Sequence, residues 1–367
     1  MKLKKYKLGD FIERSTANNR NLKYKEDLIV GVTSDGVFST PKGNVNGVDL
    51  TPYKIVNNGD FVYNPSRFDL GSIAYRTEGL CIVSHLYQIF HLNEKGKEKI
   101  DPIWLFIYLR RKEFRREVTF RNFGSQRPEF NFNDLSEIVL PLPSIEQQRK
   151  YVNIYLALQN NLAVYQSKVE DLKMVCDGYI EELRRKFGAE PIGPYLRSID
   201  VRNTNLSVTL TQGVDVNMQF ITAKREAEDQ EGTKIVRTGQ FAFNKVVKSN
   251  GTKLPIALRE GPDCVISSSY EVFEVVNKDV LLPEYLMLWL SRSETHRQCG
   301  YRSYGTTRDV FPFEDLCKLQ FPIPNIETQK DIANIYMCYI ERQRIADALK
   351  ERLKNICPVL IRGSLME

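Results

Sequence analysis

The chain has 367 residues, of which 42% are hydrophobic and 27% charged, so it can form two or more domains with real cores and is not compositionally disordered. Its 52 Lys and Arg against 46 Asp and Glu give a net charge of +6, which permits a polyanionic partner without requiring one. The longest apolar runs are too short to span a bilayer, and the lysine-containing start lacks the apolar region of a signal peptide, which predicts a cytoplasmic protein.

Residues 1–143 are predicted to form an irregular, mostly β domain. Short runs of Val, Ile, Tyr, Phe and Thr alternate there with Asn-Gly, Gly-Asp and Pro. Apolar residues at helical spacing predict a short helical region around 101–116. Residues 189–324 have the same texture, with helical spacing around 282–297. The chain therefore carries two β-rich domains of similar design.

A long helix is predicted after each domain, over residues 144–188 and 325–367. Each follows a Pro-x-Pro sequence and begins at an N-cap residue, Ser144 or Asn325. The first helix should stop at Gly188 in a left-handed conformation, and Pro358 should shorten or bend the second. At full length the first helix would extend for about 65 Å.

Both helices carry an apolar seam with the 3-4 spacing of a coiled coil. Arg342 interrupts the second seam. The first seam comprises Tyr155, Leu158, Leu162, Tyr165, Val169, Leu172, Cys176, Tyr179 and Leu183, and the second comprises Ile332, Ile335, Tyr339, Ala346, Leu349, Leu353 and Ile356. We expect the seams to pack antiparallel, which gives an α+β fold of two pseudo-twofold-related β-rich domains separated by two long coiled-coil helices.

An internal duplication underlies this symmetry. GSQRPEFNFNDLSEIVLPLPSIEQQRKYVNIY at 124–155 aligns without gaps to GTTRDVFPFEDLCKLQFPIPNIETQKDIANIY at 305–336, and 14 of the 32 positions are identical. Upstream, VNNGDFVYN and IVSHLYQIF match VRTGQFAFN and VISSSYEVF. The early segments 13–55 and 197–232 show little in common. The two copies therefore share a scaffold and differ in their early loops.

No catalytic or cofactor-binding signature is present in the sequence. It has no phosphate-binding G-x-x-x-x-G-K-[ST] motif, no G-x-S-x-G elbow and no C-x-x-C pair. Asn64-Pro-Ser-Arg67 only superficially resembles the motif of amino-methyltransferases, because it lacks the second proline and the aromatic residue. The three histidines are scattered along the chain, as expected of surface or structural residues. We therefore predict no enzyme activity, no cofactor and no metal for this chain.

The duplicated plan resembles the DNA-specificity subunit of type I restriction-modification systems. The motif that introduces each helix stands as Pro141-Leu-Pro-Ser-Ile-Glu-Gln-Gln148 and, less complete, as Pro322-Ile-Pro-Asn-Ile-Glu-Thr-Gln329. The Gly-Asp strand, the Ser-x-x-Tyr strand and the Gly-Ser-x-Arg loop are similar to those of its target-recognition domains. The second copy departs at Gln240, where the first has an acid, and at Thr328.

The resemblance implies a non-catalytic subunit whose two domains each read one half of a bipartite double-stranded DNA site. The helices would set the spacer and dock two methyltransferase subunits, which bind S-adenosylmethionine and methylate adenine. Restriction subunits are possible further partners. Two alternatives stay open: a specificity module of a related methylation or phage-defence system, and a coiled-coil scaffold that binds no DNA.

Candidate DNA contacts are basic or polar residues in the variable segments and in the repeated loop that precedes each helix. Arg127 and Arg308 follow a small residue after glycine, which suits a phosphate, although pairing with Asp134 or Asp315 is an alternative. The predicted contacts are Arg14, Arg20, Lys23, Lys25, Asn64, Arg67, Ser125 and Arg127 in the first domain, and Lys224, Arg225, Asn244, Lys245, Lys248, Lys253, Thr306 and Arg308 in the second.

Overall fold

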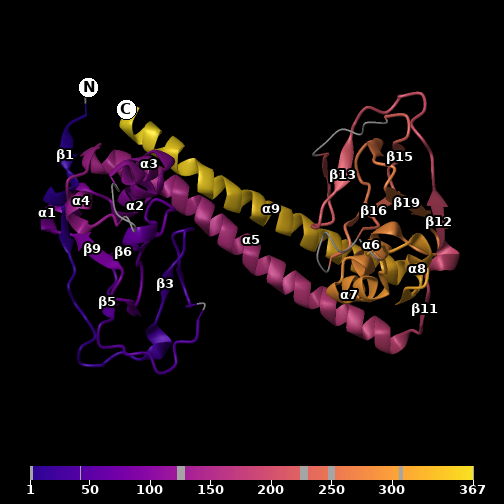
Figure 1. Ribbon diagram of the computed structural model, residues 1–367, viewed down its shortest axis with the longest axis horizontal. Helices are drawn as coiled ribbons and strands as arrows, with labels where there is room; N and C mark the ends of the chain where they lie inside the picture. The colour runs from indigo at the N-terminus through magenta and orange to yellow at the C-terminus, as the bar shows by residue number, and fades with distance from the viewer. Residues whose placement is uncertain are drawn as a thin grey trace. The chain divides into compact units, whose positions relative to one another are not determined.

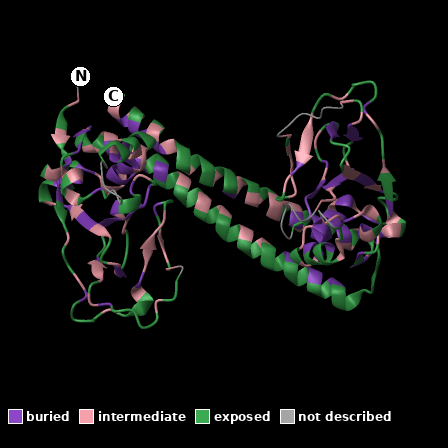
Figure 2. Ribbon diagram, in the orientation of Figure 1, coloured by how far each residue is buried: buried purple, intermediate pink, exposed green. Residues whose placement is uncertain are grey.

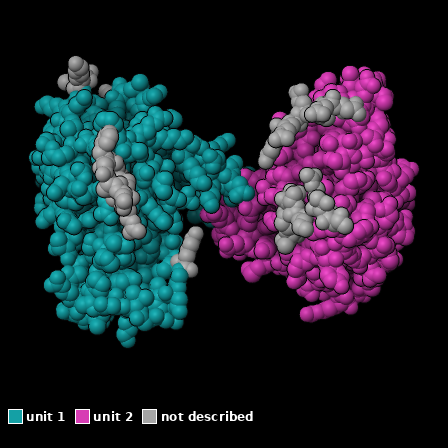
Figure 3. All heavy atoms as spheres, in the orientation of Figure 1, with its two compact units in different colours: residues 1–164, 345–367 teal, residues 165–344 magenta. Residues whose placement is uncertain are grey.

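A computed structural model describes residues 3–41, 43–121, 129–223, 230–246, 253–305 and 309–366. The chain divides into two compact units (Figure 3): unit 1 contains residues 1–164 and 345–367, and unit 2 contains residues 165–344. Each unit holds one β-rich domain and parts of the two long helices, α5 (Ile145–Lys186) and α9 (Ile326–Met366) (Figure 1).

The domain of unit 1 is built on an antiparallel four-stranded sheet in the order β2-β9-β6-β7, with the pairs β1–β10, β3–β4 and β5–β8 around it. Its elements are β1 (Lys5–Lys7), η1 (Leu8–Asp10), β2 (Ile12–Arg14), η2 (Glu26–Leu28), β3 (Gly31–Val32), β4 (Phe38–Ser39), β5 (Lys54–Val56), β6 (Phe61–Tyr63), η3 (Pro65–Arg67), β7 (Ile73–Tyr75), β8 (Cys81–Val83), β9 (Gln88–Leu92), α1 (Glu94–Lys99), α2 (Pro102–Arg110), α3 (Lys112–Arg121), α4 (Phe132–Ser136) and β10 (Val139–Pro141).

The domain of unit 2 repeats this plan, with the sheet order β12-β19-β16-β17 and the pairs β11–β20, β13–β14 and β15–β18. Its elements are β11 (Ala189–Pro191), η4 (Gly193–Tyr195), β12 (Leu196–Ile199), β13 (Gln212–Val214), β14 (Phe220–Thr222), β15 (Lys234–Val236), β16 (Phe241–Asn244), β17 (Ile256–Leu258), β18 (Cys264–Ile266), β19 (Tyr270–Val275), α6 (Pro283–Leu290), α7 (Ser293–Arg302), α8 (Phe313–Leu316) and β20 (Gln320–Pro322). The two β-rich domains predicted from the sequence are confirmed.

The inner strands β6 and β16 are buried on both faces of their sheets, whereas the edge strands β2 and β12 carry exposed residues (Figure 2). Because side chains alternate along a strand, Phe61 and Tyr63 of β6 pack with α2, whereas Val62 packs with β5, β8 and the β3–β4 hairpin. Phe61 stacks on its cross-strand partner Phe90 with ring centroids 4.8 Å apart. Their counterparts in unit 2, Phe241 and Phe273, stack at the same distance. The duplication therefore extends to the packing of the core.

A buried glutamine joins each long helix to its own domain. The Gln148 side chain accepts a hydrogen bond from Asp101 N (2.8 Å) and donates to the carbonyls of Lys99 (2.8 Å) and Pro143 (3.0 Å). Gln329 repeats these three bonds in unit 2, at 2.9, 2.8 and 2.8 Å. Both side chains are completely buried. This glutamine is the last residue of the motif that introduces each helix, so the motif fixes where the helix leaves the domain.

The long helices pair antiparallel within each unit. In unit 1 the start of α5 shares a hydrophobic cluster with the end of α9, and Gly363 lets the Tyr151 ring approach the α9 backbone. In unit 2 the end of α5 shares a cluster with the start of α9. Where the second seam is interrupted, the Arg342 guanidinium lies over the Tyr165 ring, 5.7 Å from its centroid. The expected N-caps also form, because Ser144 accepts from Gln147 N at 3.2 Å and Asn325 from Thr328 N at 2.9 Å.

The prediction that Pro358 shortens the second helix is wrong. Helix α9 continues through Pro358 to Met366. A proline removes one helical hydrogen bond, but tertiary packing compensates here. Trp104 donates its indole N–H to the Ser364 hydroxyl at 3.0 Å. Val359 is exposed, whereas three apolar residues near the proline are buried in the core of unit 1: Cys357, Leu360 and Ile361.

Two details at the end of the first helix also differ from expectation. Gly188 does not adopt a left-handed backbone, because the helix ends at Lys186 and the chain continues directly into strand β11. Tyr179 is 39% exposed, whereas Ile180 is 2% exposed and takes the seam position. A straight helix drifts away from strict 3-4 spacing, and this end of α5 packs on the domain core of unit 2 as well as on α9.

The early segments repeat their backbone despite their different sequences. Asn19 accepts from Tyr24 N at 3.1 Å and donates to the Tyr24 carbonyl at 2.8 Å. Asn203 makes the same pair of bonds with Val208, at 3.2 and 2.9 Å. Both asparagines are buried, at 1% and 2% exposure. Each therefore closes the same turn in its own domain.

Each of these turns contains a leucine with a positive φ angle, Leu22 at 50° and Leu206 at 52°. This conformation is costly for a non-glycine residue, so the buried asparagine bonds must hold it. The sequence signal is Asn-Xaa-Asn-Leu, at 19–22 and again at 203–206. A second short match, Gly-Val followed six residues later by Phe, marks the β3–β4 and β13–β14 hairpins. Within the described residues, no helix is both long and apolar enough to cross a membrane.

Candidate nucleic-acid interface

Several predicted DNA contacts lie outside the described residues. They are Ser125, Arg127, Lys224, Arg225, Lys248, Thr306 and Arg308. They include the arginines of both repeated loops, at 122–128 and 306–308. The residues that follow these loops are described, and they locate the C-terminal side of each loop on its domain.

In unit 1, the chain returns from the repeated loop beside the turn η3. Phe130 N donates to the Pro65 carbonyl at 3.1 Å, and the Ser66 hydroxyl lies 3.5 Å from a carboxylate oxygen of Glu129. Arg67 is in the same turn and exposed. The structure therefore brings Asn64 and Arg67 close to the segment that follows Arg127.

Unit 2 has the same arrangement at the end of β16. Phe311 N donates to the Lys245 carbonyl at 2.8 Å, and Val246 forms a β-bridge with Val310. Asn244 and Lys245 therefore lie beside the segment that follows Arg308. In each domain one group of predicted contacts is thus assembled from two distant parts of the chain.

The side chains in these groups differ in what they can offer a ligand. Asn64 caps η3 by accepting from Ser66 N at 3.1 Å, and Asn244 accepts from Val246 N at 3.0 Å. The Lys245 ammonium pairs with a Glu271 carboxylate oxygen at 3.0 Å. The two asparagines therefore shape their turns, and Arg67 is the exposed cation of the group in unit 1.

The other predicted contacts are exposed. Arg20, Lys23 and Lys25 belong to the Asn19 turn and the start of η2, and Lys23 lies over the Tyr24 ring at 5.6 Å. Arg14 ends β2, and Lys253 precedes β17. Burial, and then the charge of Lys253, lower the pKa of His296.

Sequence reasoning missed one repeated cation in each unit. The Arg76 guanidinium lies over the Phe38 ring of the β3–β4 hairpin, 5.3 Å from its centroid. Its counterpart Arg259 lies over Phe220 of the β13–β14 hairpin at 5.0 Å and also bonds to Gln212. These stacks hold each hairpin against its sheet. The hairpin phenylalanines of the Gly-Val match were the available signal.

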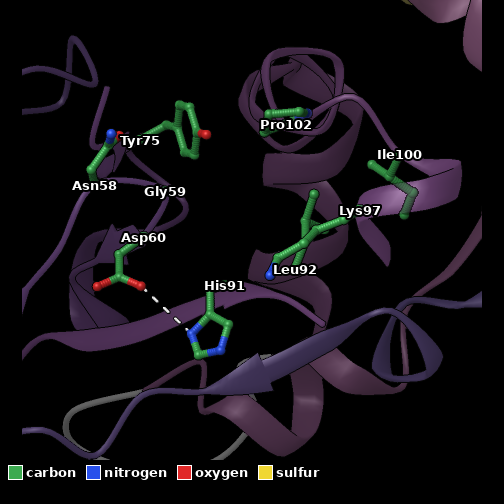
Figure 4. A pocket seen from close by; sticks show the side chains of 9 residues that line it. All are labelled: Asn58, Gly59, Asp60, Tyr75, His91, Leu92, Lys97, Ile100 and Pro102. Atoms are coloured by element: carbon green, nitrogen blue, oxygen red, sulfur yellow. Dashed lines mark ion pairs between the residues drawn. The ribbon is translucent and has the colours of Figure 1, made fainter. Parts of the chain in front are cut away.

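A pocket of about 390 Å³ in unit 1 contains the one place where a histidine lies between acids in the described chain (Figure 4). His91 Nδ1 is 3.5 Å from Asp60 Oδ1, and its Nε2 is 4.0 Å from Glu13 on the neighbouring strand. Burial raises the pKa of Asp60. The lining includes no serine, threonine or cysteine that this histidine could activate.

The equivalent positions in unit 2 show that these polar residues are structural. Gln240 donates to Glu274 at 2.8 Å, and Glu274 pairs with Arg197 across the strands. The side chain before each central strand also closes the same turn: Asp60 accepts from Asn57 N at 2.7 Å, and Gln240 from the backbone N of residue 237 at 2.8 Å. The polar contacts persist while their charges change, so the Asp-to-Gln departure preserves the turn.

Two copies of one α+β domain, each followed by a long helix, define a duplicated two-domain protein. A family model described as the type I restriction modification DNA specificity domain matches residues 2–173 and 195–355. The chain belongs to this family. Its role is to provide DNA specificity in a type I restriction-modification system without catalysing the reaction, and its partners are DNA and the methyltransferase component.

One solved structure agrees with this fold. The S subunit of a type I restriction-modification system from M. genitalium aligns with a TM-score of 0.68 at 12% sequence identity, over 98% of this chain and 95% of that chain. The HsdS subunit from Thermoanaerobacter tengcongensis aligns with a TM-score of 0.40 at 16% identity, over 99% and 96%. No curated protein matches the chain.

Proposed function

We propose that each domain reads one half of a bipartite, asymmetric DNA site. The duplicated backbone supports this proposal, because the two domains keep the same turns and hairpins but carry different side chains on them. In the asparagine turns, for example, Arg20 in one domain corresponds to Thr204 in the other. One scaffold with two sets of side chains is what a site with two different halves requires.

We further propose that α5 and α9 set the spacer and dock two methyltransferase subunits, with which restriction subunits associate. The glutamine joints at Gln148 and Gln329 support a ruler function, because each fixes the helix start to its domain through three hydrogen bonds. The complex would work in the cytoplasm, where host DNA lies.

Co-expression with the neighbouring methyltransferase, followed by mapping of modified adenines on host DNA, tests both proposals. We expect one bipartite motif with a fixed spacer. Inserting a heptad into both helices adds about 10 Å, or roughly three base pairs, and should lengthen the spacer while leaving both half-sites unchanged. Altered half-sites at an unchanged spacer would contradict the ruler function.

A separate experiment tests the proposal that Arg127 contacts a DNA phosphate. Arg127→Ala should weaken binding to all sequences and reduce the slope of log K against log salt by about one. Arg185→Ala removes an exposed arginine from α5 and serves as the control. An unchanged slope for Arg127→Ala would remove this residue from the phosphate contacts.

A further inference from the structure

A second cavity of unit 1, of about 270 Å³, is lined by five cationic side chains and two carboxylates. We call it the arginine pocket and define it by Arg110, Arg111 and Arg115 at the junction of α2 and α3, with Asp35 of the β3–β4 hairpin and Lys354 of α9 facing them. None of these residues is among the DNA contacts proposed above. The pocket is therefore a candidate site of its own.

The carboxylates of the pocket do not neutralise its arginines. Asp35 lies 3.9 Å from the Lys354 ammonium, and the other acid, Glu351, accepts from Asn355 at 2.8 Å. Within the described chain, the three arginines form no ion pair. One buried nitrogen of each, Nη1 of Arg110 and Nε of the other two, lacks a hydrogen-bond acceptor. Burial also lowers the pKa of Arg110, as expected for a desolvated cation.

Two glycines leave the space in which two guanidinium groups lie against the backbone. Gly36 has φ +75°, and a Cβ at this position would lie 1.2 Å from Arg110 Nη1. Gly71 has φ +94°, and its Cβ would lie 2.6 Å from Arg115 Nη2. Both glycines are buried. The close approach depends on their missing side chains, so the cationic wall of the pocket is preformed.

Unit 2 neutralises the equivalent position with its own acids. Arg292 is the counterpart of Arg111, 181 residues later in the chain. Three carboxylates lie within 3.9 Å of its guanidinium: those of Asp177, Glu181 and Glu294. In unit 2, the arginine at this place in the domain is therefore surrounded by carboxylates of the same chain.

The first copy lacks two of those acids and adds cations, whereas Glu294 keeps an acidic counterpart, Glu113. The α9 positions that correspond to Asp177 and Glu181 are Pro358 and Arg362, and the counterparts of Arg110 and Arg115 are Ser291 and His296. The duplicated scaffold thus serves as an internal control for charge. One copy surrounds its arginine with three carboxylates, although Arg292 Nε and Nη1 also lack hydrogen-bond partners, and the other copy leaves its three arginines without an ion pair among the described residues.

We propose that the arginine pocket binds a phosphate group, supplied either by the DNA backbone or by free phosphate. Guanidinium groups donate paired, charge-assisted hydrogen bonds that suit a tetrahedral oxyanion. Binding of a DNA backbone phosphate (the DNA source) rests on the proposed function, whereas binding of free phosphate (the free-ion source) does not. The DNA source would add a backbone contact close to α9, outside the variable segments.

Calorimetric titration of the full chain with inorganic phosphate is the first test. Arg362→Glu restores the acid found at the matching place in unit 2 and should weaken phosphate binding about tenfold or more. Arg110→Ser with Arg115→His, which copies the unit 2 residues, should weaken it similarly. Arg352→Glu makes the same charge change at an exposed α9 position outside the pocket and should have no effect. Equal phosphate affinity in wild type and Arg362→Glu would overturn the free-ion source.

The salt dependence of binding to a random-sequence duplex tests the other source. If the pocket takes a backbone phosphate, Arg362→Glu reduces the slope by about one and Arg352→Glu by less. If only the free-phosphate affinity falls, the source is the free ion. If neither readout separates the two variants, the proposal is wrong. Weaker association of Arg362→Glu with the methyltransferase, with both readouts unchanged, would assign the pocket to an acidic protein surface instead. A chain that binds no DNA at all contradicts the proposed function, and the phosphate titration still decides the pocket.

Discussion

Replacing Gln148 with methionine tests whether the buried glutamine joins the first helix to its domain. Methionine has nearly the same length and volume but can neither donate nor accept the three bonds. The change leaves Asp101 N without its acceptor and the carbonyls of Lys99 and Pro143 without their donor, in a place that water does not reach.

The expected loss follows from that count of groups. One unsatisfied buried N–H costs about 1–3 kcal/mol, and each carbonyl costs less because it keeps a second lone pair for other donors. The sum is about 2–4 kcal/mol, a large fraction of the 5–15 kcal/mol typical of a domain. Gln329→Met should cost a similar amount in unit 2, because its three bonds are the same.

Equilibrium unfolding in urea measures this loss, and hydrogen exchange locates it. Protection should fall at the start of α5 and at the loop before α2 in Gln148→Met. Gln166→Met, at an exposed position on the same helix, is the control and should stay within about 0.5 kcal/mol of wild type. If Gln148→Met also stays within that range, the reasoning about the joint is refuted.

Three further predictions concern stability. Asn19→Ala removes both bonds that hold the first turn and should cost about 1–2 kcal/mol in urea unfolding. A smaller loss is expected for Asn18→Ala, whose half-buried side chain makes two longer bonds, to the Thr16 carbonyl at 3.5 Å and from Arg20 N at 3.3 Å. Arg342→Leu restores an apolar residue to the seam and should raise stability by about 1 kcal/mol; a decrease would mean that the stack on Tyr165 contributes more than apolar contact. Burial raises the folded-state pKa of Asp60, so the contribution of this carboxyl group to stability is fully present below pH 3.8 and is lost as pH rises through the raised pKa. The stability of Asp60→Asn should therefore match that of wild type at low pH and exceed it at neutral pH. A stability difference that stays constant across this pH range would argue against this origin.

The fold was largely predictable because its strongest signals are long and repeated. The 32-residue match and the two apolar seams extend over many residues, so single exceptions such as Arg342 do not obscure them. The Pro358 prediction failed for a different reason. Local propensity argues for a helix end there, but the burial of neighbouring residues in the core of unit 1 outweighs it, and tertiary contacts of that kind cannot be read from a single segment.

The candidate site was less predictable because its parts come from distant segments. That Arg67 lies beside the segment after the Arg127 loop follows from backbone pairing between Phe130 and Pro65, which no sequence spacing indicates. The Asn-Xaa-Asn-Leu turns were overlooked because two identical asparagines and a leucine within a variable segment occur easily by chance. Their role became clear only when both leucines showed the same unusual backbone.

The division of the chain into units has a consequence for its synthesis. Unit 1 consists of residues 1–164 and 345–367, so its last segment is synthesised only after the whole of unit 2. Cys357, Leu360 and Ile361 belong to its core. At typical elongation rates of about 5–20 residues per second, the first domain must wait about 10–40 s while the whole of unit 2 is made. During that interval its apolar surface is uncovered, and the nascent chain would have to rely on chaperones or on early pairing of its own strands to avoid aggregation.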